Sequence, residues 1–309
     1  MRFVKLRITR AFVRQTNHLG SSLLLLQALY TKEVSLRNLA YFIFLFFSSQ
    51  LFANDGLVIP RSKVVELSEP ATGRTYPLFI KLPRSYESNK DKGYPVIYLM
   101  DAWYSFQIAS GATRFPMNSG VMEEAIIVGV SYSKGAKGAS SRIRDYTPSK
   151  ATNWKMQTGN GDGHAKFIRE TVFPYIEANY RAKPLERTFV GNSLGGLFGA
   201  YILFEHPNMF SSYILGSPSV WFNKNHILDS RVAKSELPIK VYLSVGSLEQ
   251  PEFGEREDMV TGAKQLAEKI KAQSGECTLL KFNLVEGAKH ATAFPTTLIQ
   301  GLDWIYGKQ

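Results

Sequence analysis

The chain has 309 residues, of which 44% are hydrophobic and 20% are charged. These proportions are typical of a folded globular protein and exclude a disordered or fibrous chain. The formal net charge of +11 would suit an anionic macromolecule, but residues 1–53 hold seven basic side chains against one acidic side chain, which leaves only +5 on residues 54–309. We therefore expect no nucleic-acid partner, and the remaining charge is compatible with a small anionic substrate.

An apolar segment near the N-terminus has the pattern of a secretory signal. Arg37 precedes the uncharged apolar run of residues 39–47, and smaller residues follow up to Ala53. The run is too short for a membrane-spanning helix, which takes about 20 apolar residues. The pattern predicts a signal peptide cleaved near Ala53, and hence a periplasmic or secreted protein without a stable membrane anchor. An uncleaved anchor is the alternative. A further hypothesis is that translation starts at Val34, which would make residues 1–33 an artefact of the gene prediction.

From residue 56 onward, short apolar runs alternate with helical patterns. Residues 63–66 and 76–81 are expected to form an opening antiparallel pair, with Gly73 in the turn. Continuous apolar runs that fit buried parallel strands follow at residues 95–100, 125–130, 188–190, 212–215, 240–244 and 279–284. The only cysteine, Cys277, can form no internal disulfide and has no metal-ligand spacing around it.

Two helices are predicted between these strands. Apolar residues recur at helical spacing over residues 166–179, where Pro174 should kink or break the helix, and again from Met259 to Ile270. Strands that alternate with helices predict an α/β fold in which helices cover both faces of a mostly parallel sheet. No linker interrupts the pattern. We therefore expect a single domain over residues 54–309, preceded by the signal peptide and the doubtful extension in residues 1–53.

Gly191-Asn-Ser193-Leu-Gly195 lies directly after an apolar strand and before a helix-compatible segment. This is the context of a nucleophile elbow, in which a serine sits on a strained strand-to-helix turn and glycines two residues away let the backbone approach closely. The pattern predicts Ser193 as a nucleophile. The N–H of Leu194, at the start of the helix, is then expected to donate to a developing oxyanion.

A serine nucleophile needs a histidine base, which is expected after the acid in chain order. The histidines are His18, His164, His206, His226 and His290. The first two precede Ser193, and His206 and His226 come before the strand that should carry the acid. His290 follows the last predicted strand, so we expect it to be the base.

The orienting acid is less clearly marked. Glu249 comes just after the penultimate strand and is our first choice. Glu255, Glu257 and Asp258 crowd the next turn, where they also suit the acidic start of the helix from Met259. All four acids stay open, as does a Ser–His dyad. A second oxyanion donor is expected from the loop after residues 95–100, where the N–H of Ala102 or Trp103 is the candidate.

Several sequence blocks together resemble the putative-esterase branch of the α/β-hydrolases, which includes esterase D-like enzymes and trilactone siderophore esterases. The resemblance covers about residues 60–305, and its blocks are residues 98–101, 141–148, 173–177, 191–198, 206–207, 217–221 and 287–290. This sequence departs from the usual family pattern at Asn192, where His or Tyr is commoner, and at Ala102, where many members carry Gly.

The resemblance implies an α/β-hydrolase fold, a serine esterase that acts through an acyl-enzyme, and no metal or organic cofactor. It also implies that Arg142, Asp145, Tyr146 and Trp221 surround the cleft of a small-molecule ester substrate. Trilactone siderophores are one such substrate class. A structural ion pair is the alternative role for Arg142 and for Arg144. Open alternatives for the whole protein are a broad carboxylesterase or thioesterase, a feruloyl-type esterase, and a catalytically silent binding protein. An acyltransferase would need an acceptor site that the sequence does not reveal.

Overall fold

A computed structural model describes residues 58–308 apart from residues 236, 274 and 276. The chain divides into two compact units, Met1–Val58 and Ile59–Gln309, and the fold given below is that of the second unit. The predicted signal peptide and its cleavage near Ala53 lie outside the described residues. Among the described helices, none has the length and apolar character needed to cross a bilayer.

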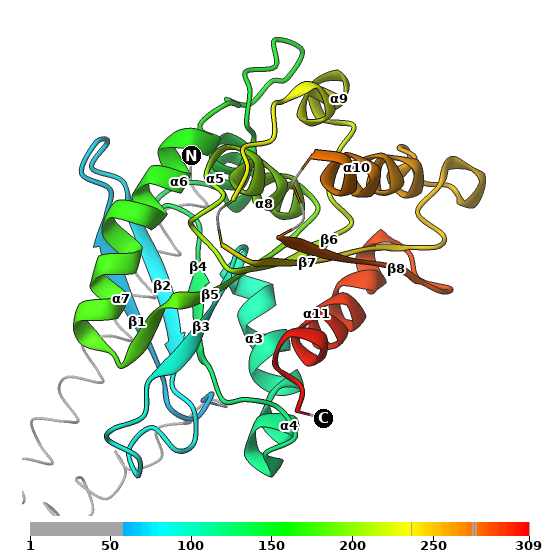
Figure 1. The fold of residues 1–309 in the computed structure, drawn as a ribbon. Helices are drawn as coiled ribbons and strands as arrows, with labels where there is room; N and C mark the ends of the chain where they lie inside the picture. The colour runs from blue at the N-terminus through cyan, green and yellow to red at the C-terminus, as the bar shows by residue number, and fades with distance from the viewer. Residues whose placement is uncertain (1–57, 236, 274, 276, 309) are drawn as a thin grey trace, which may run out of the picture. The chain divides into compact units, whose positions relative to one another are not determined.

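An eight-stranded sheet in the order β1-β2-β4-β3-β5-β6-β7-β8 forms the centre of the second unit (Figure 1). The strands are β1 (Ser62–Ser68), β2 (Thr75–Lys81), β3 (Tyr94–Leu99), β4 (Ile126–Val130), β5 (Ala182–Asn192), β6 (Ser212–Gly216), β7 (Ile239–Gly246) and β8 (Thr278–Val285). β1 pairs antiparallel with β2, and β2 pairs antiparallel with β4, whereas the other pairs are parallel. The expected α/β sheet with antiparallel strands at its start is confirmed, and Gly73, with a φ of 70°, lies in the turn between β1 and β2.

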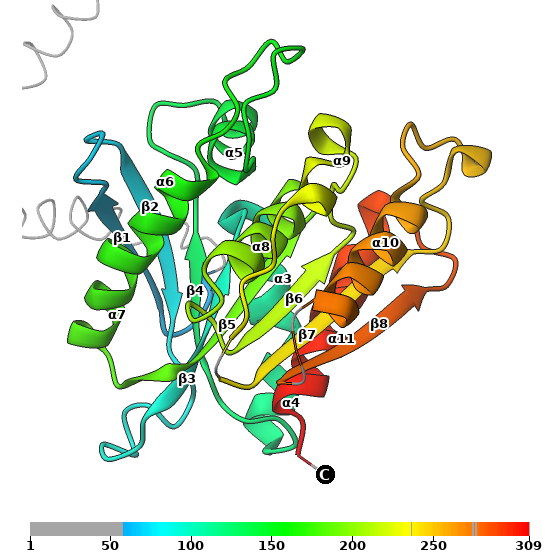
Figure 2. The same cartoon turned by 45° about the horizontal axis from the view of Figure 1, so that its top comes forward.

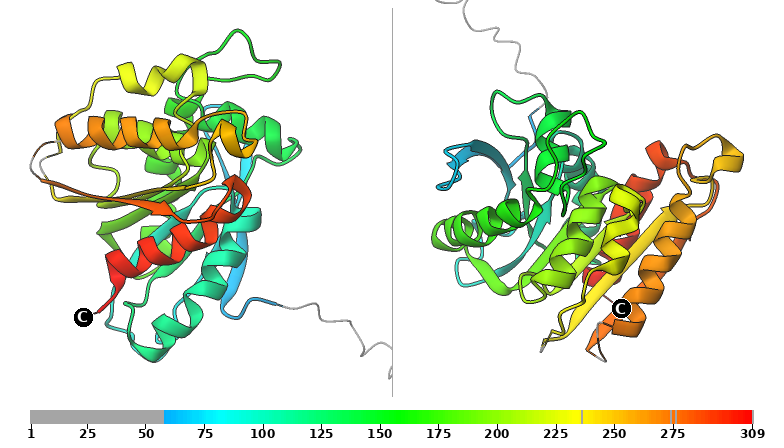
Figure 3. Two further views of the ribbon diagram at one scale, coloured as in Figure 1. Left: turned by 90° about the vertical axis from the view of Figure 1, so that its right-hand side faces the viewer. Right: turned by 90° about the horizontal axis from the view of Figure 1, so that it is seen from above.

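Helices cover both faces of this sheet (Figures 2 and 3). They are α3 (Ala102–Ala112), α4 (Arg114–Ser119), α5 (Gly138–Tyr146), α6 (Gly161–Phe167), the π-helix η1 (Ile168–Val172), α7 (Phe173–Asn179), α8 (Leu194–Glu205), α9 (Phe222–Asp229), the 3₁₀-helix η2 (Pro251–Phe253), α10 (Met259–Gln273) and α11 (His290–Tyr306). The left view of Figure 3 separates α3 and α11 on one face from α8 and α10 on the other. The predicted helices over residues 166–179 and from Met259 are both present.

The central strands divide their side chains between two hydrophobic cores. Along β3, Tyr98 packs in the core beneath α8, whereas its neighbours Ile97 and Leu99 pack in the core beneath α3 and α11. Alternate strand residues point to opposite faces, so a strand that is buried on both faces must be apolar throughout. This explains the continuous apolar runs of β3 and β4. The expectation of burial on both faces is wrong for residues 279–284, because β8 lies at the edge of the sheet and leaves Leu279 and Leu284 exposed.

The predicted break at Pro174 takes the form of a π-helical turn. The segment η1 comes directly before Phe173 and Pro174, which begin α7. Proline has no N–H to donate and its ring clashes with the carbonyl four residues earlier, so a wider turn at this point relieves both problems. The helix therefore continues to Asn179 without a loop.

His164 is an unsatisfied polar group in the core beneath α6. Its side chain is 1% exposed, and neither ring nitrogen has a hydrogen-bond partner among the described residues. Burial disfavours the charged imidazolium and outweighs the opposing effect of Asp145, so the pKa of His164 lies below its ordinary value of 6.5. Below about pH 6.5 the unfolded chain therefore binds a proton that the folded chain does not, and stability is lost as the pH falls.

We expect His164→Phe to weaken this acid sensitivity. The phenyl ring would join the surrounding rings of Tyr76 and Phe167 and would leave no unsatisfied nitrogen, each of which costs about 1–3 kcal/mol when buried. The fall in melting temperature between about pH 7.5 and pH 5 should be smaller in the variant than in the wild type. Replacement of the exposed His226 by Gln serves as the control. An undiminished fall in His164→Phe would show that other groups govern acid stability.

Candidate active site

Ser193 lies on a strained turn between β5 and α8. Its φ of 59° and ψ of −118° are unusual for a residue with a side chain. A Cβ atom at Gly191 would lie 2.3 Å from the carbonyl oxygen of Gly195, so the elbow closes only with glycine at that position. Leu194 is the first residue of α8, and its N–H consequently has no acceptor within the helix. The local geometry is that of a nucleophile elbow.

Glu249 and His290 form a hydrogen-bonded pair in which the histidine is partly exposed. The Glu249 Oε2 atom lies 2.6 Å from His290 Nδ1, and the carboxylate is fully buried. Glu249 follows β7, whereas His290 begins α11 just after β8, so the two residues come from neighbouring strand ends. An ionised carboxylate only accepts hydrogen bonds, which assigns the proton to Nδ1 and leaves Nε2 free to act as a base.

The other three candidate acids are placed differently. Glu255 and Glu257 line the cavity at Ser193, but neither makes a hydrogen bond to His290. Asp258 accepts a hydrogen bond from the N–H of Thr261 at 2.8 Å and thereby caps the start of α10. Of the four acids, the geometry therefore pairs only Glu249 with His290.

Ser193 and His290 line one cavity of about 250 Å³, together with Ser219, Trp221 and Met259. In this structure the Ser193 hydroxyl lies 3.2 Å from the hydroxyl of Ser219. The cavity thus holds a hydroxyl and an imidazole, the two groups that nucleophilic attack on an ester requires.

The segment after β3 holds the two candidates for the second backbone donor. Asp101 has left-handed backbone angles, φ 55° and ψ 50°, and its N–H donates to the Tyr146 hydroxyl at 3.1 Å. Ala102 and Trp103 are the first two residues of α3, and their N–H groups have no acceptor within the helix. The two predicted donors therefore remain available, while that of Asp101 is occupied.

Arg142 is held in a buried ion pair and does not present a free guanidinium. It donates to both oxygens of Asp101, at 2.9 and 3.0 Å, and its side chain is 23% exposed. The hydroxyls of Tyr132 and Tyr104 also donate to this carboxylate. Burial opposes the charge on Arg142, but the Asp101 carboxylate outweighs this effect and raises the pKa of Arg142 above its ordinary value. The structure favours the ion-pair alternative for this residue.

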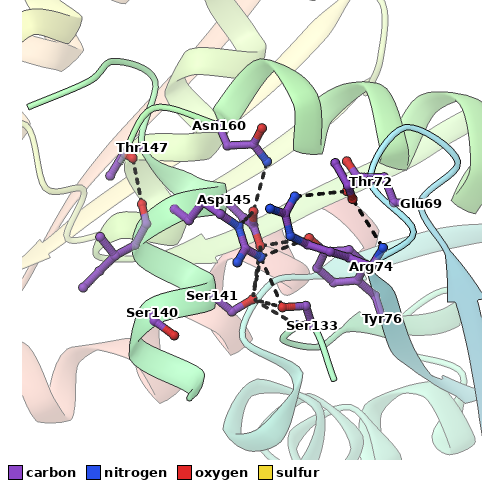
Figure 4. Close-up of polar contacts among 12 residues, drawn as sticks. Glu69, Thr72, Arg74, Tyr76, Ser133, Ser140, Ser141, Asp145, Thr147 and Asn160 are labelled. Carbon is purple, nitrogen blue, oxygen red and sulfur yellow. Dashed lines mark hydrogen bonds and ion pairs between the residues drawn. The ribbon is translucent and has the colours of Figure 1, made fainter. Parts of the chain in front are cut away.

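Asp145 and Tyr146 lie in the protein interior, each 1% exposed, and not on a cleft surface. Figure 4 shows the Asp145 carboxylate among Tyr76, Ser141 and Asn160, all of which donate hydrogen bonds to it. Arg144 pairs with the same carboxylate at 2.7 Å. Both residues therefore differ from the expected placement beside the substrate, and Asp145 instead ties α5 to β2.

Trp221, which was also expected beside the substrate, lines the cavity at Ser193. It also borders a second cavity of about 820 Å³, and Arg256 and Glu257 line both cavities. Trp154 stacks on Trp221 with ring centroids 6.1 Å apart. Lys155 and Lys224 complete the basic lining of the larger cavity. We call the two cavities together the cleft.

The family described as "Putative esterase" matches residues 69–305. The chain belongs to this family. Ferri-bacillibactin esterase BesA of Bacillus subtilis is 32% identical to it over 269 residues, which cover 81% of this chain and 91% of BesA. The solved structure of the BES protein from Bacillus cereus is 30% identical, with a TM-score of 0.71 over 82% of this chain and 98% of that one. Siderophore hydrolase EstB from Aspergillus nidulans, at 22% identity and a TM-score of 0.71, covers 82% of this chain and 96% of its own and shares the fold.

The protein is thus a carboxylic ester hydrolase of the α/β-hydrolase type. Within the described residues, no group of three or more His, Cys, Asp or Glu side chains is placed to hold a metal ion. No sequence pattern marks Trp154 or Arg256 as a cleft residue of this esterase, because neither lies in a motif block. Ser217 and Ser219 stand in the block of residues 217–221, but the block by itself assigns them no role.

Proposed function

We propose that this esterase hydrolyses trilactone siderophore esters through an acyl-enzyme on Ser193. The Glu249–His290 pair beside the Ser193 elbow carries the mechanism. His290 Nε2 takes the Ser193 proton as Oγ attacks the ester carbonyl, and then gives that proton to the leaving alkoxide as the C–O bond breaks. Water attacks the acyl-enzyme with His290 again as base, which releases the carboxylic acid and restores Ser193.

Backbone N–H groups at the N-termini of two helices stabilise the tetrahedral oxyanion in this mechanism. Leu194 begins α8, and Ala102 and Trp103 begin α3, so these donors are fixed before the substrate binds. Donors that need no reorganisation, in a site that excludes water, stabilise developing charge more strongly than solvent does. Glu249 supports the reaction because it holds His290 in the tautomer that leaves Nε2 unprotonated.

The substrate class rests on the relatives and on the chemistry of the cleft. The name of BesA, ferri-bacillibactin esterase, includes the name of a siderophore, and the match to BesA covers 81% of this chain. The larger cavity combines the stacked rings of Trp154 and Trp221 with the cations Lys155, Lys224 and Arg256. Aromatic faces and positive charges suit the catechol rings and negative charge of a catecholate trilactone.

Product analysis tests this proposal. The protein would be incubated with iron-free and iron-loaded catecholate trilactones, and in parallel with short acyl esters and feruloyl esters, and the products would be separated by chromatography. We expect ring-opened and monomeric products from at least one siderophore form. Turnover of the short or feruloyl esters without turnover of either siderophore would replace this proposal with a general or feruloyl-type esterase.

The cations of the larger cavity should strengthen the binding of anionic substrates more than that of neutral ones. We expect Lys155→Met combined with Lys224→Met to raise KM for an iron-loaded catecholate trilactone by about tenfold, because exposed charges contribute modest, salt-dependent attraction. KM for a neutral p-nitrophenyl ester should change less than about twofold. Lys183→Met, at the start of the central strand β5 and outside the lining of both cavities, is the control. Equal effects on both substrates would argue against charge recognition by these lysines.

We further propose that the mature esterase acts in the periplasm or outside the cell. The support is the apolar run of residues 39–47 followed by smaller residues up to Ala53. N-terminal sequencing of the protein from its native host would test this, and the expected first residue is Asn54. A mature chain that still contains residues 39–47 would contradict cleavage.

A further inference from the structure

Residues 216–219, which comprise the last residue of β6 and the three residues after it, contact both the candidate nucleophile and the candidate acid. We call these four residues the brace. Ser217 has a positive φ of 40°, and its N–H donates to the Ser244 carbonyl oxygen at 2.7 Å, which ties the brace to β7. A residue with a side chain adopts such backbone angles only when its surroundings impose them. The strain at Ser217 therefore indicates a fixed position for its side chain.

The Ser217 hydroxyl fixes the orientation of the Glu249 carboxylate. It donates to Glu249 Oε1 at 2.6 Å, and the N–H of Gly246 donates to the same oxygen at 2.8 Å. Oε2 is left to face His290. Ser217 and Glu249 are both fully buried, so no water competes for these bonds. The hydroxyl of the residue just after β6 thus determines which carboxylate oxygen faces the histidine.

The other end of the brace holds Ser193 by its backbone. The N–H of Ser193 donates to the Gly216 carbonyl oxygen at 2.9 Å, and the N–H of Ser219 donates to the Ser193 carbonyl oxygen at 3.1 Å. The Ser219 hydroxyl adds the contact to Ser193 Oγ. Both backbone polar groups of the strained elbow residue are therefore bonded to the brace.

Gly196 explains how the brace reaches the elbow. A Cβ atom at this position would lie 2.8 Å from the Gly216 carbonyl oxygen and 3.1 Å from Pro218 Cα. Any side chain would push the brace away from α8. The glycine that follows the elbow motif is thus required for the approach of residues 216–219.

We propose that the brace is a positioning device that sets Ser193 and Glu249 relative to each other, with Ser217 as its main positioning residue. This inference rests on the triad mechanism proposed above. Ser217 acts on the reaction through Glu249 and does not touch the substrate. Loss of its hydroxyl should leave Glu249 free to turn away from His290, which lowers the rate of the chemical step without weakening substrate binding.

The test compares Ser217→Ala and Ser217→Gly in the full-length protein. Glycine tolerates a positive φ, so the second variant removes the hydroxyl without backbone strain and keeps the fold if alanine does not. In both variants we expect kcat for a p-nitrophenyl ester to fall about 10- to 100-fold with little change in KM, as expected for loss of a hydrogen bond to a charged group. Wild-type kcat in Ser217→Gly would overturn the proposal.

A second measurement separates positioning from general destabilisation. In a Glu249→Gln background, Ser217→Gly should cause little further loss of kcat, because the two residues act as one unit. Equal losses in both backgrounds would contradict the proposal. Ser85→Ala, which removes a serine hydroxyl bonded to the Glu124 carboxylate far from the elbow, is the matched control with unchanged kcat. If Ser193→Ala stays active, the triad mechanism itself is wrong. If Ser193→Ala is inactive but the Ser217 variants keep the wild-type kcat, only the proposed role of the brace is wrong.

Discussion

Ser193→Ala is expected to lower kcat/KM for an ester by about 10⁴-fold or more, the largest effect predicted for any single change in this esterase. The variant keeps the cleft and the backbone donors but has no hydroxyl to form the acyl-enzyme. What activity remains would come from substrate binding and oxyanion stabilisation alone. The rate of p-nitrophenyl ester hydrolysis measures the loss, and covalent labelling with a fluorophosphonate probe reports the nucleophile independently.

The control for this change is Ser219→Ala, which removes the neighbouring hydroxyl 3.2 Å away in the same cavity. We expect it to cost no more than about tenfold, and to preserve labelling by the probe. The two variants differ only in which hydroxyl is missing. Comparable losses in both, or labelling of Ser193→Ala, would exclude Ser193 as the nucleophile.

The strands were predictable because their environment is simple. A parallel strand buried on both faces must be apolar throughout, and β3, β4 and the buried second half of β5 show this pattern in the sequence. The helix α3 does not show a comparable stripe. Its buried positions include Ser105 and Ser110, and these small polar residues hide the helical period. The helix α11, in contrast, carries Phe294, Leu298 and Leu302 at helical spacing on its buried face.

The local geometry of the candidate site was predictable where chain order and local pattern suffice. The Ser193 elbow depends on residues within one turn, and His290 follows the last strand. The role of Arg142 depends on a partner 41 residues away, because Asp101 is brought to it only by the folded loop after β3. A sequence pattern does not distinguish an arginine that faces a substrate from one paired with a buried aspartate. The same holds for Asp145, whose partner Tyr76 comes from β2.

Which of the four candidate acids lies against His290 likewise depends on the folded chain. The second large effect is expected from a change at Glu249. We expect Glu249→Gln to lower kcat by about 10³- to 10⁴-fold, as loss of the orienting carboxylate does in serine hydrolases. The amide fills the same space, but it can donate to Nδ1 and thereby favours the tautomer with a protonated Nε2, which is not a base. KM should change little, and the melting temperature reports any structural damage.

Two further variants decide whether this loss belongs to Glu249 in particular. Glu257→Gln changes the lining of the cleft, so it should act mainly on KM. Asp258→Asn replaces the charged cap of α10 with a neutral one and should lower stability by about 1 kcal/mol at most, with kcat unaffected. A large kcat loss in Glu257→Gln would move the acid to that position. If none of the three changes lowers kcat substantially, Ser193 and His290 work as a dyad, and the contact between Glu249 and His290 serves stability instead.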